Sequence, residues 1–203
     1  MEGAKTARAP RGQGDLLHQR LIDAALEIVD EGDIRTLSIR AVTKRAGVSP
    51  TAFYLHFESR EELLSACVGH VFGEFRDHVR AAVVGETATE RFLGSGRGYM
   101  DFARTYPERY SLLFGPDAAP ASEPGTDEKP RAAAEALDDL RTVVADYLGD
   151  SAEEVDVDLL AKGVWTGLHG YVTLRHARPM IDWPSDEQFD RMLGEAWLGP
   201  PRD

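Results

Sequence analysis

Residues 46–57 have the sequence AGVSPTAFYLHF, which marks the junction of two short helices. Gly47 is a residue type that ends helices in a left-handed conformation. Ser49 and Pro50 then favour a new helix, since serine caps a helix N-terminus and proline is tolerated at its first position. Ser38 can cap the preceding helix, in which apolar residues recur at i, i+3 and i+7: Ile39, Val42 and Ala46. Two short helices joined by a glycine turn form a unit that can place its second helix in the DNA major groove.

The second of these helices has an inner and an outer side. Helical spacing allows four residues to point inward: Val48, Ala52, Phe53 and Phe57. The outer side has Pro50, Thr51, Tyr54 and Leu55. Tyr54 and His56 can donate hydrogen bonds to phosphate oxygens, and the helix N-terminus adds backbone N–H groups. The alternative is that Tyr54 and His56 only cap a small core.

Charge is unevenly distributed along the chain. The 203 residues have a formal net charge of −12, which as a whole argues against nonspecific binding to nucleic acid. Residues 35–60, however, contain five basic residues against one acidic residue, which gives a net charge of +4: Arg35, Arg40, Lys44, Arg45 and Arg60 against Glu58. An N-terminal arm with Lys5, Arg8 and Arg11 precedes them. This part of the chain is the one suited to face an anion.

Helical periodicity continues through most of the chain. A first helix is expected to end before Gly32, and it has apolar residues at Leu17, Leu21, Ala24, Ala25 and Ile28. A capping box of Ser59 and Glu62 begins a fourth helix that extends to about Val83. Further helices are expected over 89–114 with a break at Pro107, and over 131–148, 153–177 and 185–198. Residues 115–130 are rich in Pro, Gly, Ser and acidic residues and predict a mobile loop. With no strand alternation, the predicted fold class is all-α.

Composition excludes several other classes of protein. The sequence has neither a long uncharged apolar stretch nor a secretory signal, so we expect no membrane contact and a cytoplasmic location. The single cysteine, Cys67, lies in an apolar stretch and is predicted to be a buried core residue. His169 and His176 share a helix face but lie about 10 Å apart by helix rise, too far to share a metal without other ligands. We therefore expect no cofactor and no metal site.

Residues 36–64, TLSIRAVTKRAGVSPTAFYLHFESREELL, closely resemble the helix-turn-helix signature of the TetR-like transcriptional regulators. The signature has a hydroxyl residue that opens the second helix, AGVS at the turn, an aromatic pair with Y-x-H-F, then Ser, Glu and Leu. The chain departs from it at Arg60, where lysine is usual, and at Thr43, where a small apolar residue is common. The resemblance implies a three-helix DNA-binding head on a helical body that senses a ligand and dimerises.

What the resemblance implies can be placed on individual residues. It gives a flexible basic arm over 1–14, a helix-turn-helix domain over 15–60 with its motif at 38–57, and an effector-binding and dimerisation domain over 61–203. Phosphate contacts carry over to Ser38, Tyr54, His56 and Arg60. Base contacts carry over to Arg40, Pro50 and Thr51, and Pro50 can offer only an apolar contact because it has no donor.

Two stretches of the body resemble a subgroup of TetR bodies marked by a Trp, a His-Gly pair and a Tyr-Pro-Glu-Arg-Tyr turn. They are YMDFARTYPERYSLLF at 99–114 and GVWTGLHGYVTL at 163–174. In such bodies the effector cavity lies among the middle helices. The residues expected to line it are Tyr99, Phe102, Tyr106, Tyr110, Phe114, Trp165 and His169. The alternative is an ordinary core, since an aromatic stripe at helical spacing is more often core than pocket.

The last two helices predict a dimer. The final helix has an apolar stripe and places Asp190 among its other, polar faces. Gly163, Gly167 and Gly170 permit close packing, either within the core or against a symmetry mate. We expect a two-fold, four-helix interface that includes Leu160, Val164, Leu168, Phe189, Met192, Leu193, Ala196 and Trp197.

These features predict a transcriptional regulator and not an enzyme. The expected protein is a homodimeric repressor that a small organic effector releases from palindromic double-stranded operator DNA. Two other classes stay open: an α-helical enzyme that uses the aromatic cavity, and a protein-interaction module without DNA binding. The first lacks a nucleophile and base in a catalytic context, and the intact +4 segment argues against the second.

Overall fold

The computed structural model describes residues 11–32, 34–115 and 128–199, and these residues contain helices and no strand. Three helices form the head: α1 (Arg11–Asp30), α2 (Ile39–Ala46) and α3 (Pro50–Phe53). The body has α4 (Arg60–Ala82), α5 (Ala88–Thr105), α6 (Pro107–Phe114), α7 (Glu128–Leu148), α8 (Val157–Ala177) and α9 (Asp186–Leu198). Short 3-10 helices cover Ile34–Thr36 and Gly149–Glu153. The all-α prediction is confirmed.

Side-chain caps set most of the helix boundaries. Ser38, Ser49 and Ser59 each accept a hydrogen bond from the backbone N–H three residues later. The capping box of Ser185 and Gln188 is complete. The one expected at Ser59 is not, because the Glu62 carboxylate accepts from the N–H of Glu58 instead.

Several boundaries differ from the predicted ones. The helix α1 begins at Arg11, so the last residues of the expected flexible arm are helical, while residues 1–10 lie outside the described part. The helix α3 ends at Phe53, and the chain then turns so that the ring of Phe57 returns to stack on His18 of α1. The helix α8 begins at Val157 and not at 153, because Asp156 is its cap. Most of the expected loop over 115–130 lies outside the described residues.

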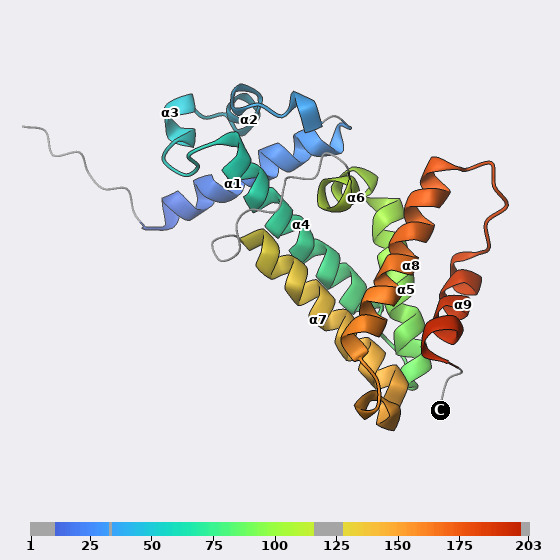
Figure 1. Ribbon diagram of the computed structural model, residues 1–203. Helices are drawn as coiled ribbons and strands as arrows, with labels where there is room; N and C mark the ends of the chain where they lie inside the picture. Colours follow the sequence, from blue (N-terminus) through green and yellow to red (C-terminus); the bar gives the residue numbers. More distant parts are fainter. Residues whose placement is uncertain (1–10, 33, 116–127, 200–203) are drawn as a thin grey trace, which may run out of the picture.

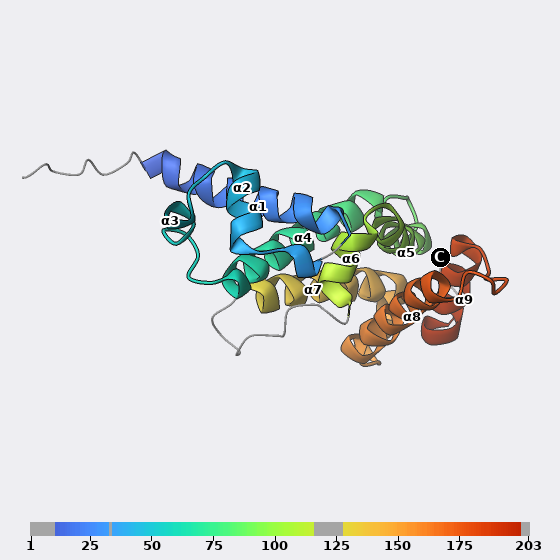
Figure 2. The same ribbon diagram turned by 90° about the horizontal axis from the view of Figure 1, so that it is seen from above.

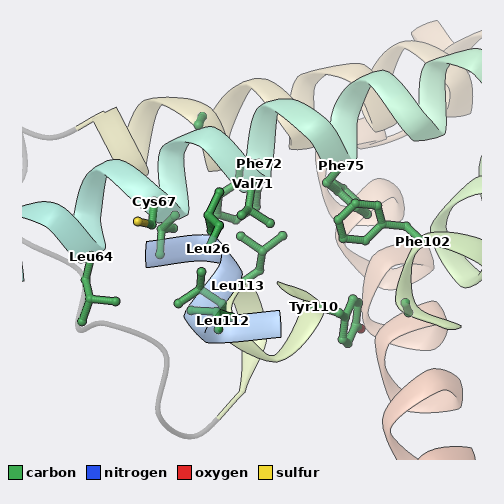
Figure 3. Close-up of a cluster of buried hydrophobic side chains, with 14 of the residues drawn as sticks. Leu26, Leu64, Cys67, Val71, Phe72, Phe75, Phe102, Tyr110, Leu112 and Leu113 are labelled. Carbon is green, nitrogen blue, oxygen red and sulfur yellow. The ribbon is translucent and has the colours of Figure 1, made fainter. Parts of the chain in front are cut away.

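The long helix α4 joins the head to the body. Figure 1 shows α1–α3 at one end, α4 running out of them beside α7, and α8 and α9 at the opposite end; Figure 2 shows the same arrangement from above. Figure 3 shows Leu26 of α1 and Leu112 and Leu113 of α6 gathered against α4 near Cys67. Cys67 is fully buried, as predicted, and burial raises the pKa of its thiol to about 12. One continuous core therefore connects the head to the body.

Glycines allow α5 to lie close against α4. A Cβ at Gly94 would overlap the carbonyl oxygen of Ala82, and one at Gly98 would lie 2.9 Å from the Cα of Val79. Each glycine costs the helix about 1 kcal/mol relative to alanine. The close helix contact explains why the chain has glycine at these positions. Within the described residues, no helix is long and apolar enough to cross a membrane.

Candidate DNA interface and ligand cavity

The helix-turn-helix is fixed by a glycine and by aromatic packing. Gly47 has φ +68°, the left-handed conformation that ends α2. Arg20 of α1 donates from its guanidinium to the carbonyl of Ala46 at 2.5 Å, which satisfies a free carbonyl at this helix end. Phe53 and Phe57 are buried, and Phe57 stacks on His18 at 4.7 Å between ring centroids. These contacts hold α3 against α1.

The outer side of α3 is free for a partner. Tyr54 is 58% exposed and Leu55 is 77% exposed, and Pro50 and Thr51 beside them are also exposed. Ser38 and Arg40 are exposed at the start of α2, whereas His56 is half-buried, with its ring 6.2 Å from that of His18. The expected outer side is therefore an open surface.

The basic residues of this segment divide into bound and free ones. Arg45 donates to the carboxylates of Glu27 and Glu31 at 3.2 and 2.7 Å. Arg40 and Lys44 are exposed, and neither has a hydrogen bond or ion pair within the described part of the chain. The charge that can face DNA is therefore smaller than the sequence count indicates.

Arg60 has a structural role in the head. Its Nε donates to the carbonyl of Leu37 at 2.6 Å, and its Nη2 to that of Ile34 at 3.2 Å. The phosphate contact expected at Arg60 would require this guanidinium to leave both carbonyls. These hydrogen bonds of Arg60 instead connect the start of α4 to the segment before α2.

The body encloses a cavity of about 530 Å³. It lies among α4, α5, α7 and α8, with Phe114 of α6 at its wall. Most of the lining is apolar, and it includes Phe72, Phe75, Val79, Val83, Leu137, Leu140, Val143 and Leu168. Both α4 and α7 are amphipathic in the sequence, but helical periodicity alone does not distinguish a side chain that lines a cavity from one that fills a core.

Three of the seven predicted cavity residues line this space: Tyr99, Phe114 and Trp165. The other four do not. Phe102 is buried against Phe75, at 5.3 Å between ring centroids, and Tyr106 is exposed beside His78. Tyr110 and His169 lie behind Tyr99. The prediction was wrong for these four because helix packing turns their side chains away from the cavity.

A polar triad supports the wall behind Tyr99. The Tyr110 hydroxyl lies 2.9 Å from that of Tyr99 and 2.7 Å from His169 Nδ1. Burial raises the pKa of Tyr110 to about 12 and lowers the pKa of His169, so all three groups are neutral near pH 7. The triad gives the cavity wall hydrogen-bonding capacity without charge.

Two family models match the chain. The model described as "Bacterial regulatory proteins, tetR family" covers residues 21–67, and "Tetracyclin repressor-like, C-terminal domain" covers residues 92–196. The chain belongs to the TetR family. The expectation of a regulator rather than an α-helical enzyme is therefore confirmed at the level of the family.

Named TetR-type relatives match mainly over part of their length. The HTH-type transcriptional regulator BetI of Rhizobium meliloti is 31% identical over 72 residues, 36% of this chain and 36% of that protein. The fatty acid metabolism regulator protein of Bacillus subtilis is 29% identical over 98 residues, 48% of this chain and 46% of that protein. The chain thus spans between about a third and a half of the length of these curated relatives.

Solved structures share the fold over nearly the whole chain. A protein of unknown function from Rhodococcus sp. RHA1 has a TM-score of 0.73 at 22% identity, over 99% of this chain and 100% of that one. FadR from Bacillus subtilis, solved in complex with stearoyl-CoA, has a TM-score of 0.63 at 17% identity, over 90% of this chain and 99% of that one. At these identities the likeness establishes the TetR fold.

The predicted dimer residues of this TetR body fall into three groups. Val164, Leu168 and Leu193 are buried inside the protomer, so they cannot form a two-fold interface. The reason is that Leu193 packs over Gly167 and Trp197 over Gly163, which joins α9 to α8. Leu160 and Phe189 are half-buried against the core, and Met192, Ala196 and Trp197 are exposed.

A second exposed row runs along α8 beside them. It contains the exposed Leu159, Thr166 and Leu174 and the half-buried Gly170, at spacings of seven, four and four residues. A Cβ at Gly170 would meet no atom within 4 Å. We call this set of residues on α8 and α9 the α8–α9 face: Leu159, Thr166, Gly170, Leu174, Met192, Ala196 and Trp197.

An ion cluster links the head to α6 and α4. Arg109 of α6 donates to the carboxylate of Asp30, at the end of α1, at 2.8 and 3.0 Å. The same guanidinium donates to Glu74 of α4 at 2.6 and 2.7 Å. These bonds raise the pKa of Arg109, Asp30 contributing most, so the guanidinium stays charged. Because α6 also places Phe114 at the cavity, one short helix touches both the cavity and the head.

Proposed function

We propose that the protein is a cytoplasmic, homodimeric repressor that binds a palindromic operator and is released from it by a small organic effector held in the cavity. The open surface of α3 beside the unpaired charges of Arg40 and Lys44 supports DNA binding most directly. Tyr54, His56 and Ser38 contact phosphates, and Arg40, Pro50 and Thr51 lie at base edges. The FadR neighbour in complex with stearoyl-CoA supports a ligand-binding body.

The coupling we propose passes through α6. An effector that displaces Phe114 moves α6, and Arg109 transmits the movement to Asp30 and hence to α1. Effector and operator then favour different head positions, so each weakens the binding of the other. The α8–α9 face pairs with its two-fold mate, so that two heads reach two half-sites on one face of the DNA.

The DNA contacts predict a specific salt dependence. Replacing Arg40 or Lys44 by alanine should weaken operator binding and reduce the slope of log K against log salt concentration by about one unit each, because each removes one counterion-releasing contact. Fluorescence anisotropy on a labelled genomic fragment that the protein binds measures this slope. Arg45→Ala is the matched control, since Arg45 is already paired with Glu27 and Glu31. Equal slopes for all three variants and the wild type would remove the assignment.

The Arg109 cluster predicts an effect on operator binding from outside the interface. We expect Arg109→Ala to weaken operator binding about fivefold or more, within the usual range of coupling energies, because α1 loses its ion pair with α6. Arg91→Ala removes a bond between α5 and α7, Arg91 to Asp146 at 2.7 Å, and should leave affinity unchanged. Anisotropy titrations compare the two, and circular dichroism checks that both variants are folded. Wild-type affinity of Arg109→Ala would contradict the proposed coupling route.

A further inference from the structure

The charged side chains in the cavity wall are held in ion pairs. Asp139 of α7 accepts hydrogen bonds from Arg76 of α4 at 2.9 Å and from Arg80 at 2.7 Å. Arg76 also forms an ion pair with Glu135. Both guanidinium groups of the lining are thus paired with carboxylates, and Glu135 also pairs with the exposed Arg131 at 3.4 Å. A ligand with a charged head group would have to break these bonds to find a partner of opposite charge, at the cost of leaving a protein charge unpaired.

The hydroxyl groups of the lining differ in whether they are already used. Thr142 donates its hydroxyl to the carbonyl of Asp138 on its own helix at 3.0 Å. Ser95 of α5 lines the cavity at 6% exposure, and its hydroxyl has no hydrogen-bond partner among the described residues. A hydroxyl that lines a cavity without a protein partner can form a hydrogen bond with a ligand there.

Tyr99 adds a second group one helical turn from Ser95. In the triad its hydroxyl lies 2.9 Å from the Tyr110 hydroxyl and 3.5 Å from His169 Nδ1. A tyrosine hydroxyl can donate one hydrogen bond and accept two. Whichever groups of the triad act as donors, Tyr99 therefore keeps the capacity for one further hydrogen bond. Ser95 and Tyr99 are spaced i, i+4 on the same face of α5 and both line the cavity. Together they can bind one hydroxyl or carbonyl oxygen.

The remainder of the cavity is long and apolar. Its lining extends along α4 from Phe72 to Val83 and along α7 from Ala133 to Val143. At 1.5 Å per residue each stretch covers about 15 Å. The ion pairs join Arg76 to Asp139 and Arg80 to Asp139, and Figure 1 shows α4 and α7 side by side, so the two walls run along each other. The space therefore fits an elongated apolar chain.

We propose that this cavity takes an uncharged, elongated, lipid-like molecule with one hydroxyl or carbonyl group, which Ser95 and Tyr99 bind, and that it discriminates against molecules of equal length with a charged head. The proposal deepens the effector role given to the cavity under the proposed function and rests on it. Ser95 and Tyr99 set the polar contact, and Asp139 sets the selection against anions by holding Arg76 and Arg80.

Three probes with the same ten-carbon chain test the charge selection: 1-decanol, decanoate and decyltrimethylammonium. Isothermal titration of the full-length protein near pH 7 should give decanol at least about tenfold tighter binding than either ion, since each ion would leave a charge unpaired in the wall. Asp139→Asn should raise the affinity for decanoate relative to that for decanol, because it frees guanidinium groups for an anion. Decanoate binding as tightly as decanol, or no gain in Asp139→Asn, would overturn the charge selection.

The polar contact is tested by removing single hydroxyls. Ser95→Ala and Tyr99→Phe should each weaken decanol binding about fivefold, the value of a typical hydrogen bond. Thr142→Val is the matched control, because its hydroxyl is already bound to Asp138, and it should bind decanol like the wild type. Equal affinities in all three variants would overturn the assignment of Ser95 and Tyr99, and so would a failure of decanol to bind at all. Since these titrations contain no DNA, they stand apart from the proposed repressor function, which fails instead if the protein binds no operator fragment.

Discussion

Replacing Asp190 by asparagine should make the protein more stable at alkaline pH and should remove most of a loss of stability that the wild type shows as pH rises. Asp190 of α9 is only 1% exposed, and neither of its carboxylate oxygens has a hydrogen-bond partner in the part of the chain that the structure describes. The carboxylate lies against Gly96 of α5, where any Cβ would overlap it. Burial raises the pKa of Asp190 from 3.8 to about 8, although Arg97 acts in the opposite direction and Asp186 in the same one.

The direction of the effect follows from where the proton is bound. Between about pH 4 and pH 8 the folded protein holds a proton on Asp190 that the unfolded chain has released, so the free energy of unfolding falls as pH rises through this window. At about 1.4 kcal/mol per unit of pKa shift, the loss is about 5 kcal/mol by pH 9. Asparagine has nearly the same shape and no charge to bury. It still leaves a buried amide without partners, which offsets part of the gain, so we expect a net gain of about 3 kcal/mol at pH 9.

Denaturant unfolding near pH 5, 7 and 9 measures this difference. The quantity to compare is wild type minus variant, because other titrating groups contribute equally to both proteins. Glu195→Gln is the matched control: Glu195 is an exposed acid on the same helix, and its variant should follow the wild-type curve. If the curves of wild type and Asp190→Asn stay parallel from pH 5 to 9, Asp190 is not protonated in the folded state.

Asp190 also shows where sequence-based reasoning stops. Caps and breakers act within a few residues, so Ser38, Ser49, Pro107 and Ser185 predicted helix boundaries that the structure confirms. The stripe of α9 placed Asp190 on a polar face, yet the structure buries it. Only Gly96, nearly a hundred residues earlier, makes room for it, and periodicity within one helix contains no information about such a distant neighbour.

The same limit explains which parts of the candidate site could be predicted from the sequence. Exposure of Tyr54 and burial of Phe53 and Phe57 could be predicted, because a short motif fixes the orientation of α3. The cavity could not, because its lining depends on how five helices pack together. Arg60 illustrates the difference within the motif itself: its position was predictable, but its bonds to two carbonyls from a preceding segment were not.

Placing an arginine at Gly170 should convert the protein into a monomer and reduce operator affinity by about a hundredfold or more. A Cβ at Gly170 would meet no atom within 4 Å outside its own stretch of helix, so a side chain can leave the helix at this position. The position lies at the centre of the α8–α9 face, between Thr166 and Leu174. Two such faces related by a two-fold axis would bring two buried guanidinium groups together without partners, which costs several kcal/mol.

Sedimentation velocity and operator anisotropy test the dimer together. Gly170→Ala is the control: the small side chain should stabilise α8 by about 1 kcal/mol and leave the dimer intact. Charged substitutions at Leu168 and Leu193 would not test the interface, because both residues are buried within the protomer and a charge there would unfold it. Met192→Glu provides a second variant on the same face, since Met192 is 54% exposed. Dimeric Gly170→Arg and Met192→Glu with wild-type operator affinity would place the interface elsewhere.

Loss of operator binding in the monomer follows from the geometry of the head. One copy of α3 spans only part of a major groove, and two copies reach successive grooves on one DNA face only when the bodies hold them about 34 Å apart. In a dimer, binding of the first head raises the effective concentration of the second. A monomer with the free charges of Arg40 and Lys44 still in place should retain the weak, salt-dependent binding of a single head. A monomer that binds weakly but keeps the salt slope of a single head has therefore lost the dimer interface only. A misfolded head would lose both the binding and its salt dependence.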